Sequence, residues 1–455
     1  MDYQKLFEPK TMAVIGVSLS NDSHPANVVF NKNRLRYPVN TFAVNPKGGS
    51  FHRTEIFASV ADIPEKIDLA VIAVRADLVP GVLSECIEAG AAGAVVISGG
   101  FAESGRKDLQ DRIAAIAREA DFPFVGPNCL GIYSPDHVDT FFLPSERMVY
   151  PNAGNIALVS QSGGVLVDQM INLADEGVGL SVAVSVGNKA LIDEVALLGY
   201  LSAHPGTEVI AFYLEGFEKN GGRDFVSAAR QCGKPVIALK SGRSPEGGRA
   251  VSSHTASLAG DYEVFSEVLS QYGVVEARSQ FELVSFCESL SCYKRPIQGK
   301  VGIITGSGGH GALAVDLCVA HDLSVPRISE KVQAEVREGL SRAAQPIAAL
   351  GNPIDLTGSA VDDDFVVAAE CLSRTDEVDC ILLLVLPYSP GTTSDLGARL
   401  SRVYLREGKP LVAYVPHVEK YRMLIEGFEL NRIPVSPAIE GAVLMVDAMR
   451  RCQPC

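Results

Sequence analysis

Short apolar runs that end in glycine-rich or polar turns recur along this chain, and an amphipathic stretch follows each of them. In the first third of the chain these runs are TMAVIGVS, TFAVNPKGG, DLAVIAVR, AGAVVISGG and FPFVGPNCLG. Strands that alternate with helices of roughly 10–15 residues form parallel βαβ units, because each crossover helix returns the chain to the same edge of the sheet. The pattern therefore predicts an α/β fold made of doubly wound parallel sheets.

The length of 455 residues allows two to four domains, since a domain usually has roughly 100–200 residues. The strand pattern predicts three, at residues 1–135, 151–295 and 299–455. The third repeats the second: KVGIITGSGG parallels NIALVSQSGG, and KPLVAYVP parallels KPVIALKS. The repeat is degenerate, because Leu386-Pro387 replaces Glu215 and nothing replaces the SSHT segment. We therefore expect the chemistry to lie in the second domain.

Composition excludes several classes of function. The net charge is −14 and no Lys/Arg cluster alternates with aromatic residues, which argues against a nucleic-acid groove. No apolar run approaches the roughly 20 residues of a membrane span, and the N-terminus has no hydrophobic signal core, so a cytoplasmic protein is expected. The ten cysteines do not pair with histidines at zinc-ligand spacing, and we expect reduced thiols and no metal site.

The turns of the first predicted sheet indicate a ligand site, because ligands of such sheets bind beyond the carboxyl ends of the strands. The turn after the first strand lacks GxGxxG, and no acidic residue closes the second strand. Lys47 stands there instead, and it suits a diphosphate or a phosphorylated ribose. A nucleotide-type cofactor is the favoured interpretation, and ordinary turn residues are the alternative. The strand ends read Gly16-Val17-Ser18, Asn45-Pro46-Lys47, Val74-Arg75, Ser98-Gly99-Gly100 and Gly126-Pro127-Asn128.

A second anion site is predicted where the first strand of the second domain meets its helix. The junction reads Ser160-Gln161-Ser162-Gly163-Gly164. Consecutive N–H groups at a helix N-terminus, together with two hydroxyls, suit a phosphoryl group. No Lys-Ser/Thr follows the glycines, so this is not a Walker A loop. A purely structural turn is the alternative, since serine and glycine favour turns in any case.

One histidine stands in an unusual context, VIALKSGRSPEGGRAVSSHTASLAG, which we interpret as a strand, a mobile glycine-rich loop and a helix starting near Thr255 to Ala259. Its neutral imidazole is a good nucleophile near pH 7, so His254 is a candidate carrier of a reactive group. Glu215, at the end of the preceding strand, can fix the imidazole tautomer. Glu218 is a weaker candidate for that role. The alternatives are a capping or solvent-facing histidine and an exposed glutamate.

The order of these motifs resembles one family. GVS, NPK, GPNCLG, LVSQSGG, VGNK, YLEG, LKSGR and SHTASLAG occur in this order across the chain. The series is similar to the alpha subunit of ADP-forming acetyl-CoA synthetase and, more distantly, to that of succinyl-CoA synthetase; the third domain is similar only to the acetyl type. The resemblance implies a Rossmann-like CoA-binding domain followed by two flavodoxin-like, parallel-sheet domains.

The resemblance also implies a ligase that joins a small carboxylic acid to CoA while ATP is cleaved to ADP and phosphate. Its route passes through an acyl phosphate and a phosphohistidine matching His254. A glutamate matching Glu215 steadies that phosphohistidine, and the segment matching Ser160, Gln161, Ser162, Gly163 and Gly164 receives the phosphate. The implied CoA positions are Gly16, Ser18, Lys47, Val74, Arg75, Ser98 and Gly99, with Asn128 where the thioester and acyl group meet.

A partner is implied as well. Nothing in the 455 residues supplies an ATP-grasp fold, so we expect ATP or ADP and Mg²⁺ to bind a separate beta subunit in an alpha2beta2 heterotetramer. The alternative is a catalytically silent protein of the same fold that binds CoA or acyl-CoA and has a regulatory role. Two positions depart from the family: Ala26 or Asn27 lies near a usual glycine of the CoA loop, and Leu191 replaces an acidic residue.

Overall fold

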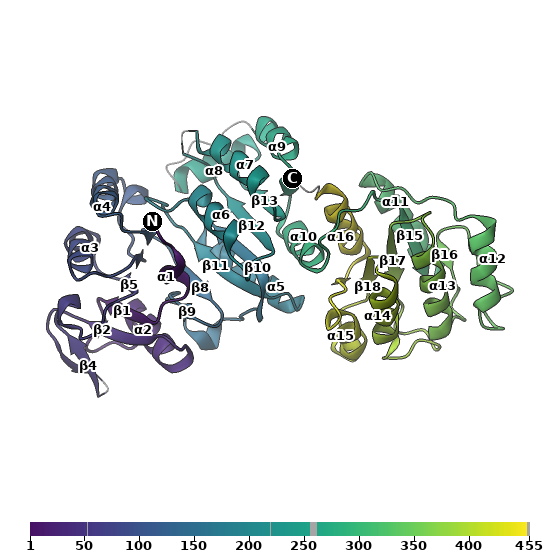
Figure 1. The fold of residues 1–455 in the computed structure, drawn as a ribbon, viewed down its shortest axis with the longest axis horizontal. Helices are drawn as coiled ribbons and strands as arrows, with labels where there is room; N and C mark the ends of the chain where they lie inside the picture. The colour runs from purple at the N-terminus through teal and green to yellow at the C-terminus, as the bar shows by residue number, and fades with distance from the viewer. Residues whose placement is uncertain (52, 219, 255–261, 453–455) are drawn as a thin grey trace. The chain divides into compact units, whose positions relative to one another are not determined.

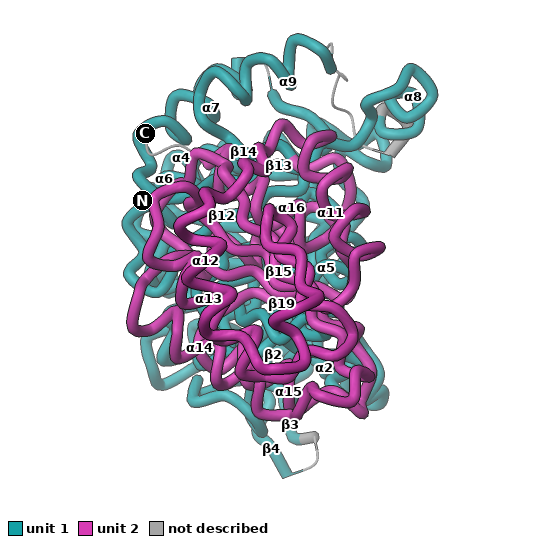
Figure 2. The backbone as a smooth tube through the Cα atoms, turned by 90° about the vertical axis from the view of Figure 1, so that its right-hand side faces the viewer, with its two compact units in different colours: residues 1–276, 455 teal, residues 277–454 magenta. Residues whose placement is uncertain are grey.

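The computed structural model describes residues 1–51, 53–218, 220–254 and 262–452, and the side chains of residues 51 and 252–254 lie outside that description. The chain divides into two compact units, Met1–Glu276 and Ala277–Pro454, which Figure 2 colours separately. Among the described residues, no helix is both long and apolar enough to cross a membrane.

The first sheet of unit 1 has seven strands in the order β3-β4-β2-β1-β5-β6-β7. All neighbours are parallel except the β3–β4 hairpin. Its strands are β1 Thr11–Ile15, β2 Asn40–Val44, β3 Gly49–Phe51, β4 Thr54–Phe57, β5 Leu69–Ile72, β6 Ala94–Val96 and β7 Phe124–Val125. The helices in this part of the chain are α1 Gln4–Phe7, α2 Pro25–Arg36, α3 Val79–Glu88 and α4 Lys107–Glu119 (Figure 1).

The second sheet of unit 1 also has seven strands, in the order β14-β13-β12-β10-β11-β8-β9. Strands β13, β12, β10 and β11 are parallel, and β8 and β9 extend the sheet in antiparallel pairing. Its strands are β8 Gly131–Ser134, β9 Val138–Asp139, β10 Ala153–Ser160, β11 Leu180–Ser185, β12 Val209–Leu214, β13 Val236–Lys240 and β14 Val275–Ala277. The accompanying helices are α5 Gly163–Asp175, α6 Glu194–Ala203, α7 Gly221–Gln231, α8 Pro245–His254 and α9 Tyr262–Gln271.

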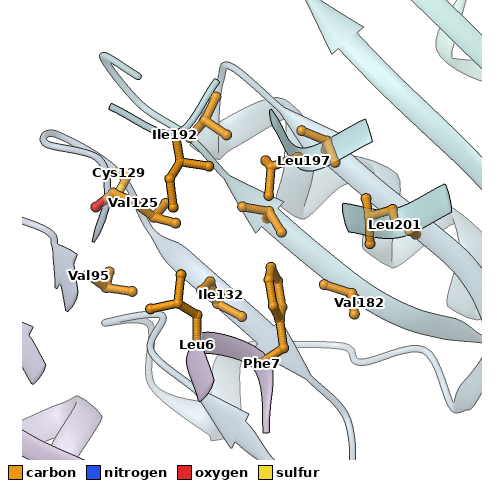
Figure 3. Packing of buried hydrophobic residues seen from close by; sticks show 14 of the residues in the cluster. Leu6, Phe7, Val95, Val125, Cys129, Ile132, Val182, Ile192, Leu197 and Leu201 are labelled. Atoms are coloured by element: carbon orange, nitrogen blue, oxygen red, sulfur yellow. Dashed lines mark hydrogen bonds between the residues drawn. The ribbon is translucent and has the colours of Figure 1, made fainter. Parts of the chain in front are cut away.

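The two sheets of unit 1 share one hydrophobic core. The short helix α1 contributes Leu6 and Phe7, both fully buried, to a cluster that contains Val95 of the first sheet and Ile132 of the second (Figure 3). Helix α6 adds Leu197 and Leu201 to the same cluster. Burial of this apolar surface stabilises the two sheets as one body.

Unit 2 is built on a five-stranded parallel sheet in the order β16-β15-β17-β18-β19. The strands are β15 Val301–Thr305, β16 Ile354–Asp355, β17 Cys380–Leu384, β18 Leu411–Tyr414 and β19 Val435–Ser436. The helices are α10 Gln280–Cys292, α11 Gly308–Ala320, α12 Glu330–Gly339, α13 Asp362–Arg374, α14 Leu396–Glu407, α15 Arg422–Glu429 and α16 Ile439–Arg451.

Two elements lie on the other side of a predicted domain boundary. Helix α10 falls in the predicted second domain, yet it packs against α16 in unit 2, and its Glu288 carboxylate accepts the Val435 N–H (2.7 Å). Strand β8 falls in the predicted first domain, yet it pairs with β11 of the second sheet. Local sequence patterns indicate that an element exists, whereas only long-range contacts assign it to a sheet.

The internal repeat is visible in the strand order. The order β11-β10-β12-β13-β14 of unit 1 matches β16-β15-β17-β18-β19 of unit 2. The turns that follow β10 and β15 also share their hydrogen bonds: Ser160 Oγ bonds the carbonyl and the N–H of Ser162, as Thr305 Oγ1 bonds those of Ser307. The two units therefore provide an internal comparison, position by position.

Candidate functional site

The carboxyl edge of the second sheet brings the predicted catalytic segments together. Strands β10, β12 and β13 are consecutive neighbours in this sheet. The register pairs Ser160 with Tyr213, and Leu214 with Lys240. The turn after β10, Glu215 after β12 and the segment that leads to His254 after β13 consequently leave the sheet side by side.

The turn after β10 is closed by its own serines. Ser160 is fully buried, and its hydroxyl donates to the Ser162 carbonyl (2.7 Å) and accepts the Ser162 N–H (3.1 Å). Ser162 caps helix α5 by accepting the Val165 N–H (3.4 Å). The N–H groups of Gly163 and Gly164 belong to the first helical turn, where no intrahelical acceptor is available. The anion-binding capacity of this turn therefore lies in backbone N–H groups.

Gln161 contacts the strand end that carries Glu215. Its N–H donates to the Tyr213 carbonyl (3.2 Å). Its side-chain oxygen accepts the N–H groups of Glu215 (2.6 Å) and Gly216 (3.1 Å), and its side-chain nitrogen donates to the Gly216 carbonyl (2.9 Å). These bonds use the side-chain amide to hold the backbone around Glu215.

Glu215 is buried, with 5% of the residue exposed, so the alternative of an exposed glutamate is wrong. Its carbonyl accepts from Lys240 Nζ (2.8 Å), which also donates to the Ser241 carbonyl (2.5 Å). Lys240 is equally buried. Burial lowers the pKa of the Lys240 ammonium, and the negative charge of Glu215 opposes that change.

A second buried lysine holds the next residue. Lys189 Nζ donates to the Gly216 carbonyl (2.7 Å) and pairs with the Glu194 carboxylate at 2.9 and 3.1 Å. Both side chains of this ion pair are almost completely buried. Burial raises the pKa of Glu194, and the Lys189 charge opposes that change. Together with Gln161, this pair fixes the Glu215–Gly216 turn.

The segment before His254 is a helix, and the prediction of a mobile loop there is wrong. Helix α8 runs from Pro245 to His254. Ser244 caps it by accepting the Gly247 N–H (3.0 Å), and Pro245 occupies the first helical position. A methyl group added to Gly247 would lie 3.3 Å from Gly242 Cα, so the glycine permits close packing of the helix on the preceding turn. The His254 side chain and the helical turn predicted over 255–259 lie outside the described residues.

The predicted CoA positions lie along one edge of the first sheet. Strand β1 lies between β2 and β5, so the chain leaves it in opposite directions and creates a topological switch point. Gly16 sits there with φ +102°, and a methyl group on it would lie 2.4 Å from the Ala73 carbonyl oxygen. The neighbouring strand ends carry the other predicted residues: Ser18 after β1, Lys47 after β2, Val74 and Arg75 after β5, Ser98 and Gly99 after β6, and Asn128 after β7.

Asn27, one of the two residues expected near the usual glycine of the CoA loop, fixes the turn that contains Ser18. It is buried in helix α2, and its side chain accepts the Ser18 N–H (2.6 Å) and donates to the Ser18 carbonyl (2.9 Å). The Asn45 side chain likewise donates to the Val17 carbonyl (2.8 Å) and accepts the Lys47 N–H (2.9 Å). Two asparagines thus preorganise the switch-point turns.

Asn128 links the two sheets of unit 1. Its side chain donates to the Asn188 side chain (3.3 Å), which in turn donates to the Glu103 carboxylate. That carboxylate also accepts the N–H groups of Gly100 (2.5 Å) and Phe101 (3.1 Å). Burial raises the pKa of Glu103, but these hydrogen bonds outweigh it and hold the pKa below its ordinary value. The turn after β6 is therefore tied to the turn after β11.

Sequence reasoning missed four supporting residues, Lys240, Lys189, Glu194 and Glu103. Lys240 had one detectable signal, a charged residue that ends the apolar run VIALK. The roles of the other three depend on contacts with residues distant in sequence: Lys189, which pairs with Glu194, donates to the Gly216 carbonyl, and Glu103 accepts from Asn188. Among the described residues, no group of three His, Cys, Asp or Glu side chains could hold a metal ion.

Comparison with known proteins identifies the two domains of unit 1 and the family of the chain. Residues 10–135 match the model of a CoA binding domain, and residues 153–290 match that of a succinyl-CoA ligase like flavodoxin domain. In a solved structure of acetyl-coenzyme A synthetase 1 from Ca. Korarchaeum cryptofilum, described as in complex with phosphate and ADP, the aligned chain has a TM-score of 0.89 and 29% identity, covering 99% of this chain and 96% of that one.

Two curated relatives are similar over much of the sequence. Acetate–CoA ligase [ADP-forming] I of Archaeoglobus fulgidus is 36% identical over 84% of this chain, which spans 55% of that relative's length. The alpha subunit of acetate–CoA ligase [ADP-forming] I of Pyrococcus furiosus is 33% identical over 99% of this chain and 97% of its own length. The fold class expected from the sequence is confirmed. The chain belongs to the family of ADP-forming acyl-CoA synthetases and is similar to their alpha subunits.

Proposed function

We propose that this chain is the alpha subunit of an ADP-forming acyl-CoA synthetase, which joins a small carboxylic acid to CoA while ATP is cleaved to ADP and phosphate. One observation supports this most. The helix start at Gly163, the buried Glu215 and the segment that carries His254 leave three consecutive strands at one edge of one sheet. A phosphoryl acceptor, a carboxylate and an anion-binding turn are the parts that phosphoryl transfer through histidine requires.

In the acyl-CoA-consuming direction, phosphate attacks the thioester carbon, the C–S bond breaks, and CoA leaves as the thiolate. The resulting acyl phosphate then transfers its phosphoryl group to a ring nitrogen of His254, and the P–O bond to the acyl group breaks to release the carboxylate. Glu215 orients the imidazole, and the N–H groups of Gly163 and Gly164 stabilise the charge on the phosphoryl oxygens. The synthetic direction uses the same steps in reverse.

The first sheet suits CoA as a substrate. Lys47 and Arg75 are exposed cations that follow β2 and β5, the two strands on either side of β1, and both can face a diphosphate. The absent side chain of Gly16 lets the chain turn tightly at the switch point. By the family resemblance, Asn128 would lie near the thioester and acyl group, and its side chain donates to Asn188 in the turn after β11.

The partner in this proposal is an ATP-grasp beta subunit in an alpha2beta2 assembly, and that subunit binds ATP or ADP with Mg²⁺. The name of the Pyrococcus relative, an alpha subunit, supports a two-chain enzyme. The regulatory alternative has less support, because Glu215, Lys240 and the glycines of the turn are retained in unit 1.

Labelling with [³²P]acetyl phosphate tests the proposal on the full chain. We expect acid-labile, base-stable label on this chain, its loss in His254→Asn, and its retention in His137→Asn, which removes an imidazole from the β8–β9 turn. Full labelling of His254→Asn would exclude the mechanism. CoA binding without any labelling would favour the regulatory alternative. With an ATP-grasp partner added, CoA ligation of short-chain, aryl and sulfonated acids would identify the acid.

A further inference from the structure

We infer that Lys240 is a positioning residue for the proposed phosphohistidine: it acts through Glu215, whose backbone it holds in place and whose carboxylate its charge keeps in the ionised form. The inference rests on the proposed function and identifies a residue that the sequence motifs do not assign. It starts from a contact, the 2.8 Å hydrogen bond from Lys240 Nζ to the Glu215 carbonyl.

The charge of Lys240 needs a buried counter-charge. Both residues are 5% exposed, and a buried ammonium is costly unless a carboxylate compensates it. The hydrogen bonds of Lys240 go to two carbonyls, which do not neutralise it. The Glu215 carboxylate belongs to the residue whose carbonyl accepts one of these bonds, and its negative charge raises the pKa of the Lys240 ammonium against the effect of burial. The two residues therefore form a charge couple at the edge of the sheet.

The internal repeat shows that the fold does not require this couple. In unit 1, Ser160 pairs with Tyr213, and Leu214 on the same strand as Tyr213 pairs with Lys240. In unit 2, Thr305 is the counterpart of Ser160; it pairs with Leu384, which also pairs with Tyr414. Leu384 is therefore the counterpart of Tyr213, and the residue after Tyr414 is the counterpart of Lys240. Glu215 thus corresponds to Leu386, and Lys240 to Val415. Both of these residues are buried. Unit 2 has lost both charges together, as expected if each charge is needed only where the other is present.

Two other titratable groups near Glu215, among the residues that the structure describes, do not supply the positive charge of Lys240. Tyr213, on the same strand, has a pKa raised first by burial, and the Glu215 charge raises it further, so it stays neutral near pH 7. The Lys189–Glu194 pair next to Gly216 is internally neutral. Removal of the Lys240 charge should therefore raise the pH at which the Glu215 carboxylate takes up a proton.

The test is the pH profile of His254 labelling by [³²P]acetyl phosphate. We expect Lys240→Met to raise the pH at which labelling is lost on the acid side of the profile by about one pH unit or more, and Lys240→Arg to restore the wild-type value. Lys234→Met is the matched control: Lys234 lies just before the same strand, and its ammonium also donates to two carbonyls, those of Leu201 and His204. It should keep the wild-type value. The inference would be overturned if labelling of Lys240→Met fell at the same acidic pH as labelling of the wild type. It would also be overturned if Lys240→Met shifted this pH by the same amount when Glu215 is already replaced by glutamine.

Urea unfolding separates this inference from the proposed function. Each of Glu215→Leu and Lys240→Val leaves one buried charge, whereas the double variant copies unit 2. We expect the urea midpoint of the double variant to lie above that of the less stable single variant. Additive losses would refute the couple even if labelling occurs. A coupled result without wild-type labelling would refute the proposed function and leave Lys240 and Glu215 as a structural pair only.

Discussion

Replacement of Gln161 by methionine should destabilise unit 1 by a predictable amount. The side-chain oxygen of Gln161 accepts the N–H groups of Glu215 and Gly216, and both residues are buried. Methionine has a similar volume but accepts neither bond. A buried donor left without its acceptor costs about 1–3 kcal/mol, so the two donors together cost about 2–6 kcal/mol. The Gly216 carbonyl keeps its bond from Lys189 and adds no third penalty.

The matched control is Gln169→Met, the same substitution in helix α5. Gln169 is fully buried, and neither of its side-chain polar atoms has a hydrogen-bond partner among the described residues. Methionine there removes a buried amide that makes no bond, so stability should stay unchanged or rise. The same substitution at these two buried glutamines should therefore lower the stability at one position and not at the other.

Urea unfolding followed by far-UV circular dichroism measures both effects on the full chain. We expect the Gln161→Met midpoint to fall well below the wild-type value and its rate of labelling by acetyl phosphate to drop, because the Glu215 backbone loses its anchor. The Gln169→Met midpoint should equal or exceed the wild-type value. Equal losses in the two variants would refute the reasoning, since they would show that buried volume, and not hydrogen bonding, decides the result.

Three further predictions concern the supporting residues. Lys189→Met leaves the buried Glu194 carboxylate unpaired and should cost about 3–5 kcal/mol in urea unfolding, with much of the loss recovered by adding Glu194→Gln. Glu103 has a folded-state pKa below its ordinary value of 4.5, so its contribution to stability is complete well above that value and is lost as the pH falls through the lower folded-state pKa. Glu103→Gln should therefore abolish this part of the pH dependence of urea unfolding, which lies below pH 4.5. Gly16→Ala should lower the melting temperature more than Gly49→Ala and should weaken CoA binding in calorimetry. The two glycines have almost the same φ, but of the two only Gly16 has a neighbour within 4 Å of the added methyl group. Equal melting temperatures would contradict this.

Local sequence patterns were sufficient to predict much of the fold. Each apolar run with its glycine turn became a strand that ends at the edge of the sheet where the predicted site residues lie, as at Gly16 and at Ser160. The patterns succeeded because hydrophobic periodicity and turn chemistry act between residues close in sequence. The ordered motifs also led to the family, which is confirmed. The prediction of a loop before His254 was wrong, because glycines also suit a helix that packs closely on Gly242.

The sequence by itself determined the alternation of strands and helices, the repeat and the candidate residues His254 and Glu215. The tertiary structure alone decided what surrounds them. Gln161 meets Gly216, and Lys240 meets Glu215, because β10, β12 and β13 are neighbours in the sheet, and strand order is not a local property of the chain. The same holds for α10, which long-range packing on α16 assigns to unit 2. Buried charges and amides depend on such distant partners, since their cost is offset only by contacts that form when the whole unit folds.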